Sequence, residues 1–330
     1  ATEDKLSASA EPSLVRKIKP TSLAKEINLA KKLKSEAIKQ LSTAFDSLAH
    51  GMKIDNDALL SVVDQSYESQ LRNGHALLSL LHVSNVKGDL MNHCFNVMGM
   101  ALILGQQMDL SDEELIHLGS AALLMDIGWC KLPNELFKSP ATYTEEEYTE
   151  VQKHVDFSVE ALDEAGFDYK IVELVVKHHE RIDGTGYYSN YRGSDVPLGA
   201  QILSLADHYN SKIRGLYDTA SVIPATALKE IYIKARQGSH DMGLVELLIQ
   251  LVGIYPISSA VQLNTKEKAV VTKVNWRDSL KPTVRIYYDR QGANLPKPID
   301  IDLFKDAEDI NSRAVKKVID PFSSDNDPYQ

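Results

Sequence analysis

The sequence predicts a mostly α-helical protein that ends in a small β unit. Through most of the chain apolar residues recur at helical spacing, as Ala30, Leu33 and Ala37 do. After Gly253 the pattern changes to short β-branched runs separated by turn residues. The 330 residues, 43% of them hydrophobic and 25% charged, are enough for one large core and one or two smaller units.

Charge and cysteine content narrow the class of protein. The net charge of −10 argues against a partner that is a nucleic acid polymer or an anionic membrane, but it leaves room for a small phosphate ligand at a local site. Cys94 and Cys130 lie in apolar helical stretches, which predicts free thiols in a reducing compartment. No apolar run is long enough to span a bilayer, and Ala1–Lys5 lacks the apolar core of a signal peptide. We therefore expect a cytoplasmic protein without a membrane span.

Residues 1–82 form the predicted helical N-terminal region. Residues 1 to about 22 are polar and contain Pro12 and Pro20, so we expect them to be loosely held. Helices follow to residue 82: Gly51 ends one of them, and Asp55-Asn56-Asp57 begins the next. The favoured interpretation is a packing or homodimer module, and a surface for a protein partner is the alternative.

Residues 83–252 form the predicted central domain, and two helices in its first half place a histidine or an acid beside apolar residues. Asp89 and His93 are four residues apart, so both lie on one helix face. Ser111 and Glu114 form a capping box that opens the apolar helix Leu115–Met125, and Asp126 follows its end. A carboxylate there is costly unless it is paired or metal-bound, or caps the next turn. His93 is either a hydrogen-bonded core residue or a ligand.

The second half of this domain repeats the pattern. A capping box at Thr144 and Glu147 opens a helix that carries His154. A helix over 168–177 then delivers His178-His179, and the run Asp183-Gly184-Thr185-Gly186-Tyr187-Tyr188 ends it. The helix Leu198–Tyr209 holds Asp207 near its end. One buried and one surface histidine would be the plain interpretation of the His-His pair alone, whereas imidazole is also the commonest transition-metal ligand.

Residues 253–305 form the predicted β extension, and residues 306–330 an acidic tail. The strand-like runs are Ile254–Pro256, Ala260–Leu263, Ala269–Val274 and Thr283–Tyr288. The tail is rich in Ser, Asp and Pro from Asp320 to Pro328, so we expect it to be partly disordered.

The order of these residues resembles the HD-GYP family of bacterial phosphodiesterases within the HD superfamily. The resemblance covers roughly residues 85–260, and its most specific segment is His178-His179-Glu180-Arg181-Ile182-Asp183-Gly184-Thr185-Gly186-Tyr187. It implies an HD-type helical bundle with two, sometimes three, metal ions that opens cyclic di-GMP. By matching positions, the implied metal ligands are His93, Asp126, His154, His178, His179 and Asp207, with Asp89 as an additional one.

The resemblance also implies roles around the metals. Asp126 would bridge two divalent ions, iron first and manganese second, which suit a donor set of imidazole and carboxylate without thiolate. Asp183 is a candidate for proton transfer or for orienting a metal-ligand histidine, and Tyr187 is the tyrosine of the motif. Arg192 and Arg214 are the candidates for contact with the phosphate of cyclic di-GMP or a related phosphodiester.

Three departures from the family pattern keep a second hypothesis open. Met125 replaces the histidine of the His-Asp doublet, Trp129 replaces a lysine, and Tyr188 replaces a proline, a milder change expected to loosen the turn. The first hypothesis is a hydrolase that acts on cyclic di-GMP. The second is a catalytically weak member that acts as a sensor of this ligand or as an interaction module, and a third is another nucleotide hydrolase of the HD superfamily.

Overall fold

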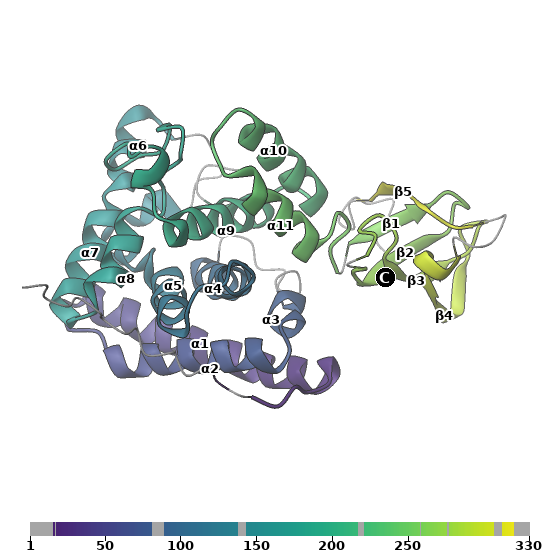
Figure 1. Cartoon of the computed structure of the whole chain (residues 1–330), viewed down its shortest axis with the longest axis horizontal. Helices are drawn as coiled ribbons and strands as arrows, with labels where there is room; N and C mark the ends of the chain where they lie inside the picture. Colours follow the sequence, from purple (N-terminus) through teal and green to yellow (C-terminus); the bar gives the residue numbers. More distant parts are fainter. Residues whose placement is uncertain are drawn as a thin grey trace, which may run out of the picture.

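The computed structural model consists of a helical body followed by a small β-sheet that lies to one side of it (Figure 1). It describes residues 16, 18–80, 89–137, 143–216, 221–257, 259–275, 277–306 and 312–319. The predicted tail Asp320–Pro328 and most of the predicted loose N-terminus lie outside these residues. The helices of the body are α1 Leu23–Ala49, α2 Asn56–Arg72, α3 His75–Ser79, α4 Leu90–Gln107, α5 Asp112–Leu124, α6 Glu145–Gln152, α7 His154–Ala165, α8 Tyr169–Val176, α9 Leu198–Arg214, α10 Pro224–Arg236 and α11 Met242–Val252, with the short 3-10 turns η1 Ile127–Lys131, η2 Asn134–Phe137 and η3 Gly193–Asp195. The mostly helical fold class is confirmed.

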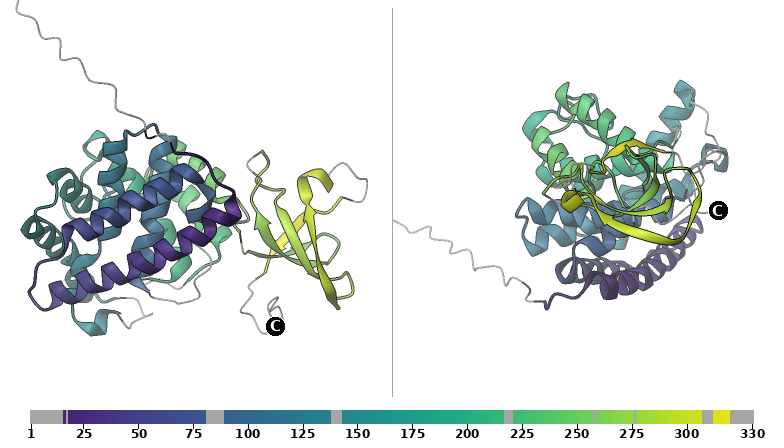
Figure 2. Two further views of the ribbon diagram at one scale, coloured as in Figure 1. Left: turned by 90° about the horizontal axis from the view of Figure 1, so that it is seen from below. Right: turned by 90° about the vertical axis from the view of Figure 1, so that its right-hand side faces the viewer.

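The N-terminal helices α1 and α2 lie side by side across the base of the body (Figure 2, left). Asp55 caps α2 by accepting a hydrogen bond from the Ala58 N–H, as its place in the sequence predicts. The fully buried Glu26 of α1 accepts hydrogen bonds from Arg72 at the end of α2. Buried residues of α1 and α2 belong to the same hydrophobic core as those of α4, α5 and α9. The N-terminal region therefore packs as part of the helical body.

The long central helix α4 is buried on nearly all sides from Asn92 to Gly105. It packs against α5, which ends two residues before the predicted acid Asp126, and against α9, which carries the predicted acid Asp207. The Ser111–Glu114 capping box that opens α5 is present, as predicted. These three helices bring residues from distant parts of the sequence to one place.

The β-sheet is antiparallel, with the strand order β4-β3-β2-β1-β5. Its strands are β1 Ala260–Leu263, β2 Lys268–Lys273, β3 Thr283–Tyr288, β4 Asn294–Asp302 and β5 Val315–Val318, and the short helix α12 Leu303–Asp306 follows β4. One face covers a small core of its own, built from Val261, Leu263, Ala269, Val271, Val284, Ile286 and Leu303. The predicted β extension is thus present beside α11 (Figure 1).

Three details of the predicted β region are wrong. Ile254–Pro256 is not a strand. Strand β4 was missed because its polar sequence contains Pro296 and Pro298, which only an edge strand tolerates. Strand β5 lies in the segment predicted as a tail, and its register pairs Val261 with Val318. The β unit therefore extends beyond residue 305.

Candidate metal centre

The segment that follows α5 lies against the start of α7, and this contact places Asp126 beside His154. Gly128 of η1 approaches α7 so closely that a Cβ atom there would lie 2.2 Å from the His154 carbonyl oxygen. The Gly128 N–H donates to Ser158 Oγ at 2.9 Å, and Ser158 Oγ donates to the Met125 carbonyl at 2.8 Å. Only glycine permits this approach. The result is a short Asp126 Oδ1 to His154 Nε2 distance of 3.4 Å.

Two histidine rings are fixed by hydrogen bonds to backbone carbonyls. His154 Nδ1 lies 2.7 Å from the Val151 carbonyl oxygen, and His178 Nδ1 lies 2.5 Å from the Val175 carbonyl oxygen. Since a carbonyl oxygen only accepts, each Nδ1 carries the proton. Each Nε2 of the neutral rings therefore presents a lone pair. This is the usual arrangement of a metal-binding histidine, whose other nitrogen donates to a carbonyl or carboxylate.

These lone pairs converge on one point. His154 Nε2 lies 3.4 Å from His178 Nε2 and 3.2 Å from His179 Nε2. Ligand atoms of Asp126, His154, His178 and His179 all lie within 4.8 Å of one another. Two facing Nε2 lone pairs cannot share a hydrogen bond, because neither nitrogen has a proton to donate. A cation bound between them would satisfy both, so the donor set fits a divalent metal ion.

A second group of donors lies on the other side of Asp126. His93 Nε2 lies 3.1 Å from Asp207 Oδ1 and 3.6 Å from Asp126 Oδ2. His93 Nδ1 lies 3.0 Å from Asn210 Oδ1, which fixes the ring as the carbonyls fix the other histidines. His179 Nδ1 lies 3.6 Å from Asp207 Oδ2. Asp126 thus presents one oxygen to each group.

Burial keeps most of these groups in the form that binds metal. Burial lowers the pKa of His154 to about 4 and also lowers the pKa of His178 and His179, so these imidazoles are neutral near pH 7. Burial alone would raise the pKa of Asp207, but the hydrogen bond from His93, together with the charge of that ring, outweighs burial and lowers this pKa. Burial opposes charge on His93 too, yet Asp207 raises its pKa above the ordinary value.

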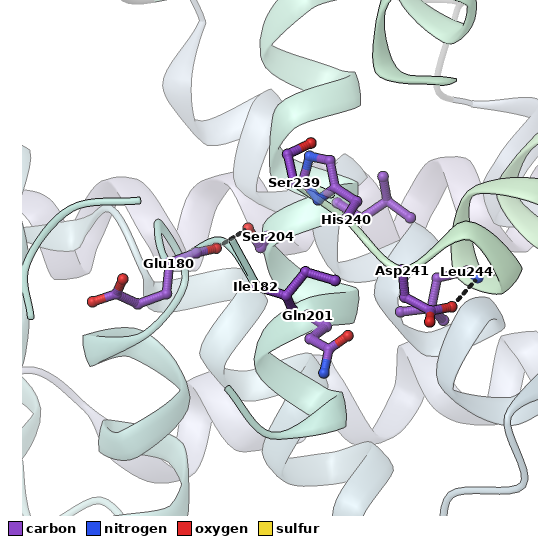
Figure 3. A pocket seen from close by; sticks show the side chains of 9 residues that line it. Glu180, Ile182, Gln201, Ser204, Ser239, His240, Asp241 and Leu244 are labelled. Carbon is purple, nitrogen blue, oxygen red and sulfur yellow. Dashed lines mark hydrogen bonds between the residues drawn. The ribbon is translucent and has the colours of Figure 1, made fainter. Parts of the chain in front are cut away.

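The turn that carries His178 and His179 is tied to the helices behind it. A Cβ atom on Gly186 would lie 2.5 Å from the Glu180 Cα, so the turn closes only with glycine. Ser204 Oγ donates to the Glu180 carbonyl, and the Ile182 N–H donates to the Ser239 carbonyl. Figure 3 shows the small pocket behind this turn. The pocket is a neighbour of the metal centre rather than part of it, since its lining is Glu180, Ile182, Gln201, Ser204, Leu205, Ser239, His240, Asp241 and Leu244.

Comparison with protein families identifies the helical body and the sheet separately. Residues 68–244 match the family described as HD domain, and this match covers more than half of the chain. The chain belongs to the HD domain family. Residues 260–321 match a KOW domain associated with HD domain, which agrees with a β unit that includes β5.

Several curated relatives are similar to this HD domain protein. The chain is 28% identical over 283 residues to Cyclic di-GMP phosphodiesterase PA4108 of Pseudomonas aeruginosa, covering 85% of this chain and 68% of that protein. It is 23% identical over 205 residues to Cyclic di-GMP phosphodiesterase PdeB of Borreliella burgdorferi and 26% identical over 206 residues to the response regulator RpfG of Xanthomonas campestris pv. campestris. The chain spans 54% and 50% of the lengths of these two relatives.

A solved structure shares the fold. Bd1817, described as an HDG"Y"P protein from Bdellovibrio bacteriovorus, superposes with a TM-score of 0.57 at 20% identity, covering 68% of this chain and 71% of that chain. Together with the family match, this likeness confirms the resemblance to HD-GYP proteins that the motif residues indicate. Among the helices that the structure describes, none is both long and apolar enough to cross a membrane.

The HD domain brings together most of the residues singled out from the sequence. Six of them contact one another as described above. Five of the six are at most 3% exposed, namely His93, Asp126, His154, His178 and Asp207, and His179 is partly exposed. Tyr187 joins them, because its ring stacks on His179 with centroids 4.4 Å apart.

Two predicted acids have other partners. Asp89 is the N-cap of α4, and its oxygens accept from the Asn92 backbone N–H at 3.1 Å and the Asn92 side chain at 2.5 Å. Asp89 precedes the first helical residue and its carbonyl accepts from the His93 N–H at 3.0 Å, so it lies one turn before His93, and its role as an additional metal ligand stays a prediction. Asp183 accepts hydrogen bonds from the backbone N–H and hydroxyl of Thr185, which holds the turn.

The two predicted arginines lie in different surroundings. Arg192 is exposed, and its side chain covers Gly184. Arg214 is 5% exposed at the end of α9. Burial lowers the pKa of its guanidinium group, and the nearby charge of Asp89 offsets only part of this effect.

Three residues shape the site through contacts that the sequence did not predict. Trp129, 2% exposed, stacks on His154 with centroids 5.4 Å apart, so an aromatic ring lies where the family has a lysine. Asn210 fixes His93, and its position three residues after Asp207 on one helix face was the signal available. Ser158 joins segments that are distant in the sequence and gave no signal.

Tyr188, which stands where the family has a proline, adopts a backbone angle that proline cannot adopt. Tyr188 has a φ of 100°, whereas proline is fixed near −65°. Its hydroxyl donates to Asp156 of α7 at 2.8 Å. This side-chain contact joins the turn to α7, and the expectation that the turn is looser than one with proline stays a prediction.

Proposed function

We propose that this HD domain protein is a metal-dependent phosphodiesterase of the HD-GYP type, which hydrolyses cyclic di-GMP at a binuclear metal centre. The observation that carries the proposal is the position of Asp126. Its Oδ1 faces His154 and His178, while its Oδ2 faces His93. A carboxylate with one oxygen toward each of two donor groups is suited to bridging two metal ions.

The two metal-binding groups would be unequal. The first consists of Asp126, His154, His178 and His179, and the second of His93, Asp207 and the second oxygen of Asp126. Both sets combine imidazole with carboxylate and contain no thiolate, which suits iron, followed by manganese. When bound, such ions acidify water and stabilise negative charge on the phosphoryl oxygens.

The chain's own side chains would prepare this chemistry. The neutral histidines keep their lone pairs toward the ions, because the Val151 and Val175 carbonyls hold their Nδ1 protons. The burial of Asp126 and His93 excludes bulk water, which strengthens charge interactions in the site. Burial also raises the pKa of Tyr187, so its hydroxyl keeps its proton and can donate to a phosphate oxygen.

The substrate assignment comes from the relatives. PA4108, PdeB and RpfG are all named cyclic di-GMP phosphodiesterases. The proton-transfer role of Asp183 and the phosphate contacts of Arg192 and Arg214 stay predictions from the motif. A cytoplasmic location and a homodimer or protein partner through the N-terminal helices stay predictions from the sequence.

The experiment is hydrolysis of cyclic di-GMP by purified protein reconstituted with Fe²⁺ or Mn²⁺ under reducing conditions. We expect a linear dinucleotide or GMP, detected by chromatography, and loss of at least about 100-fold in turnover for Asp126→Asn. Glu160→Gln, at an exposed position of α7, is the control and should retain activity. An active Asp126→Asn variant would contradict the proposal.

A catalytically weak sensor is the second candidate, and position 125 favours it. Met125 takes the place of the histidine of the family's His-Asp doublet, and its side chain is fully buried in the hydrophobic core. A sensor binds cyclic di-GMP without forming product. If the protein is an enzyme that is slow because Met125 impairs metal binding, Met125→His should raise its turnover. Unchanged turnover in Met125→His would instead favour the sensor.

A further inference from the structure

Two rows of aromatic rings lead from the metal centre to the protein surface. In the first row Trp129 stacks on His154, with centroids 5.4 Å apart and planes at 30°. Phe137 meets Trp129 edge to face, with centroids 5.2 Å apart. Trp129 is 2% exposed, whereas Phe137 is 46% exposed. The row thus begins at a histidine of the cluster and ends at a ring in contact with solvent.

The second row begins at the neighbouring histidine. Tyr187 stacks on His179, with centroids 4.4 Å apart and planes at 23°. Tyr148 of α6 meets Tyr187 edge to face, with centroids 5.9 Å apart. Tyr148 is 44% exposed. The rings of His154 and His179, where the two rows start, are 5.1 Å apart.

The outer ends of the two rows are carried by segments that are fastened together. Phe137 is the last residue of η2, and Tyr148 lies in α6. The Tyr143 hydroxyl, just before α6, donates to the Leu136 carbonyl in η2 at 2.9 Å. The two exposed rings therefore belong to one rim beside the metal centre.

Packing explains the inner rings but not the outer ones. Trp129 and Tyr187 orient His154 and His179 by stacking on them. Phe137 and Tyr148 leave nearly half of their surface in water, so their burial contributes little to the stability of the fold. Exposed aromatic rings beside a site for a nucleotide are suited to stacking on bases, since every base presents a π-face.

We propose that Phe137 and Tyr148 form a base-stacking subsite for the purines of a nucleotide substrate. The proposal rests on the proposed function and adds to it that substrates with bases are preferred over bare phosphodiesters. The first turn of α6 is acidic, with Glu145, Glu146 and Glu147. Acidic residues disfavour a phosphate at this rim and favour an uncharged base with N–H donors, such as guanine.

The test compares two substrates in the metal-loaded protein. Phe137→Ala and Tyr148→Ala should each raise the KM for cyclic di-GMP by about 5- to 150-fold, the value of one stacked base. Hydrolysis of glycerophosphocholine, a phosphodiester that has no aromatic ring to stack, should change less than about twofold. Tyr148→Phe keeps the ring and should behave as the unmodified chain. Tyr169→Ala removes an aromatic residue that is 71% exposed on α8 and serves as the control.

The outcomes separate this proposal from the proposed function. Equal losses on both substrates, or unchanged KM for cyclic di-GMP, would overturn the subsite. If the unmodified protein hydrolyses neither substrate, the proposed function fails. Calorimetric titration with cyclic di-GMP then tests the subsite. If the subsite exists, Phe137→Ala and Tyr148→Ala bind the ligand more weakly than the unmodified chain, whereas Tyr169→Ala binds it equally well.

Discussion

Gly128→Ala tests whether the contact between η1 and α7 positions the metal centre. The added Cβ atom would lie 2.2 Å from the His154 carbonyl oxygen and 2.5 Å from the Ser158 backbone nitrogen. Non-bonded carbon contacts are normally about 3.5 Å, so the two segments must separate by roughly 1 Å. Both clashing atoms are backbone atoms, so no side-chain rotation relieves them.

The expected magnitude follows from that displacement. Overpacking of this kind destabilises a protein by about 1–3 kcal/mol. A shift of about 1 Å also exceeds the roughly 0.2 Å tolerance of metal–ligand distances, since Asp126 and His154 lie on the two segments that separate. We expect metal affinity to fall by about 10- to 100-fold, as it does when supporting contacts of metal ligands are lost.

The assay is calorimetric titration of metal-free Gly128→Ala with Mn²⁺, together with urea unfolding. Gly166→Ala is the matched control at the other end of α7: its φ of 75° strains an alanine, but nothing lies within 4 Å of the added atom. It should lose about 1–2 kcal/mol of stability and keep its metal affinity. Gly128→Ala with unchanged metal affinity would refute the positioning argument.

Three further predictions concern the surroundings of the cluster. Ser158→Ala leaves two buried backbone groups without this partner and should destabilise the protein by about 2 kcal/mol or more in urea unfolding; a loss below about 0.5 kcal/mol would contradict it. In metal-free protein, burial lowers the pKa of His154 from 6.5 to about 4. Its contribution to stability is therefore complete above pH 6.5 and is lost as the pH falls toward 4, at up to about 1.4 kcal/mol per pH unit. Unfolding of His154→Gln in EDTA at pH 7, 6 and 5 should show a shallower slope, and an equal slope would count against this cause. Tyr188→Pro should cost more than about 1 kcal/mol because of the positive φ, whereas Tyr188→Phe should cost less; equal stabilities would argue against the strained turn.

Features set by neighbouring residues were predictable from the sequence. The capping boxes at Ser111 and Thr144 need only residues three positions apart, and both are present. His178 and His179 were found because the helix and glycine turn around them are local.

Features set by packing between distant segments were not predictable in this way. The spacing of Asp89 and His93 is the same whether Asp89 is a ligand or a helix cap, and the structure shows the cap. Ser158 and Gly128 act through contacts across 30 residues. Strand β5 was missed because its Lys316 and Lys317 resemble a solvated tail, although edge strands commonly carry lysine.

The central claim is that Asp126 joins two metal-binding groups. Its most direct test is the metal content of purified protein and of Asp126→Asn, measured by inductively coupled plasma mass spectrometry after reconstitution with Fe²⁺ or Mn²⁺. The unmodified chain should hold about two ions, and Asp126→Asn should lose most of both while remaining folded by circular dichroism. Metal-free unmodified protein, or an Asp126→Asn variant that still holds two ions, would contradict the claim.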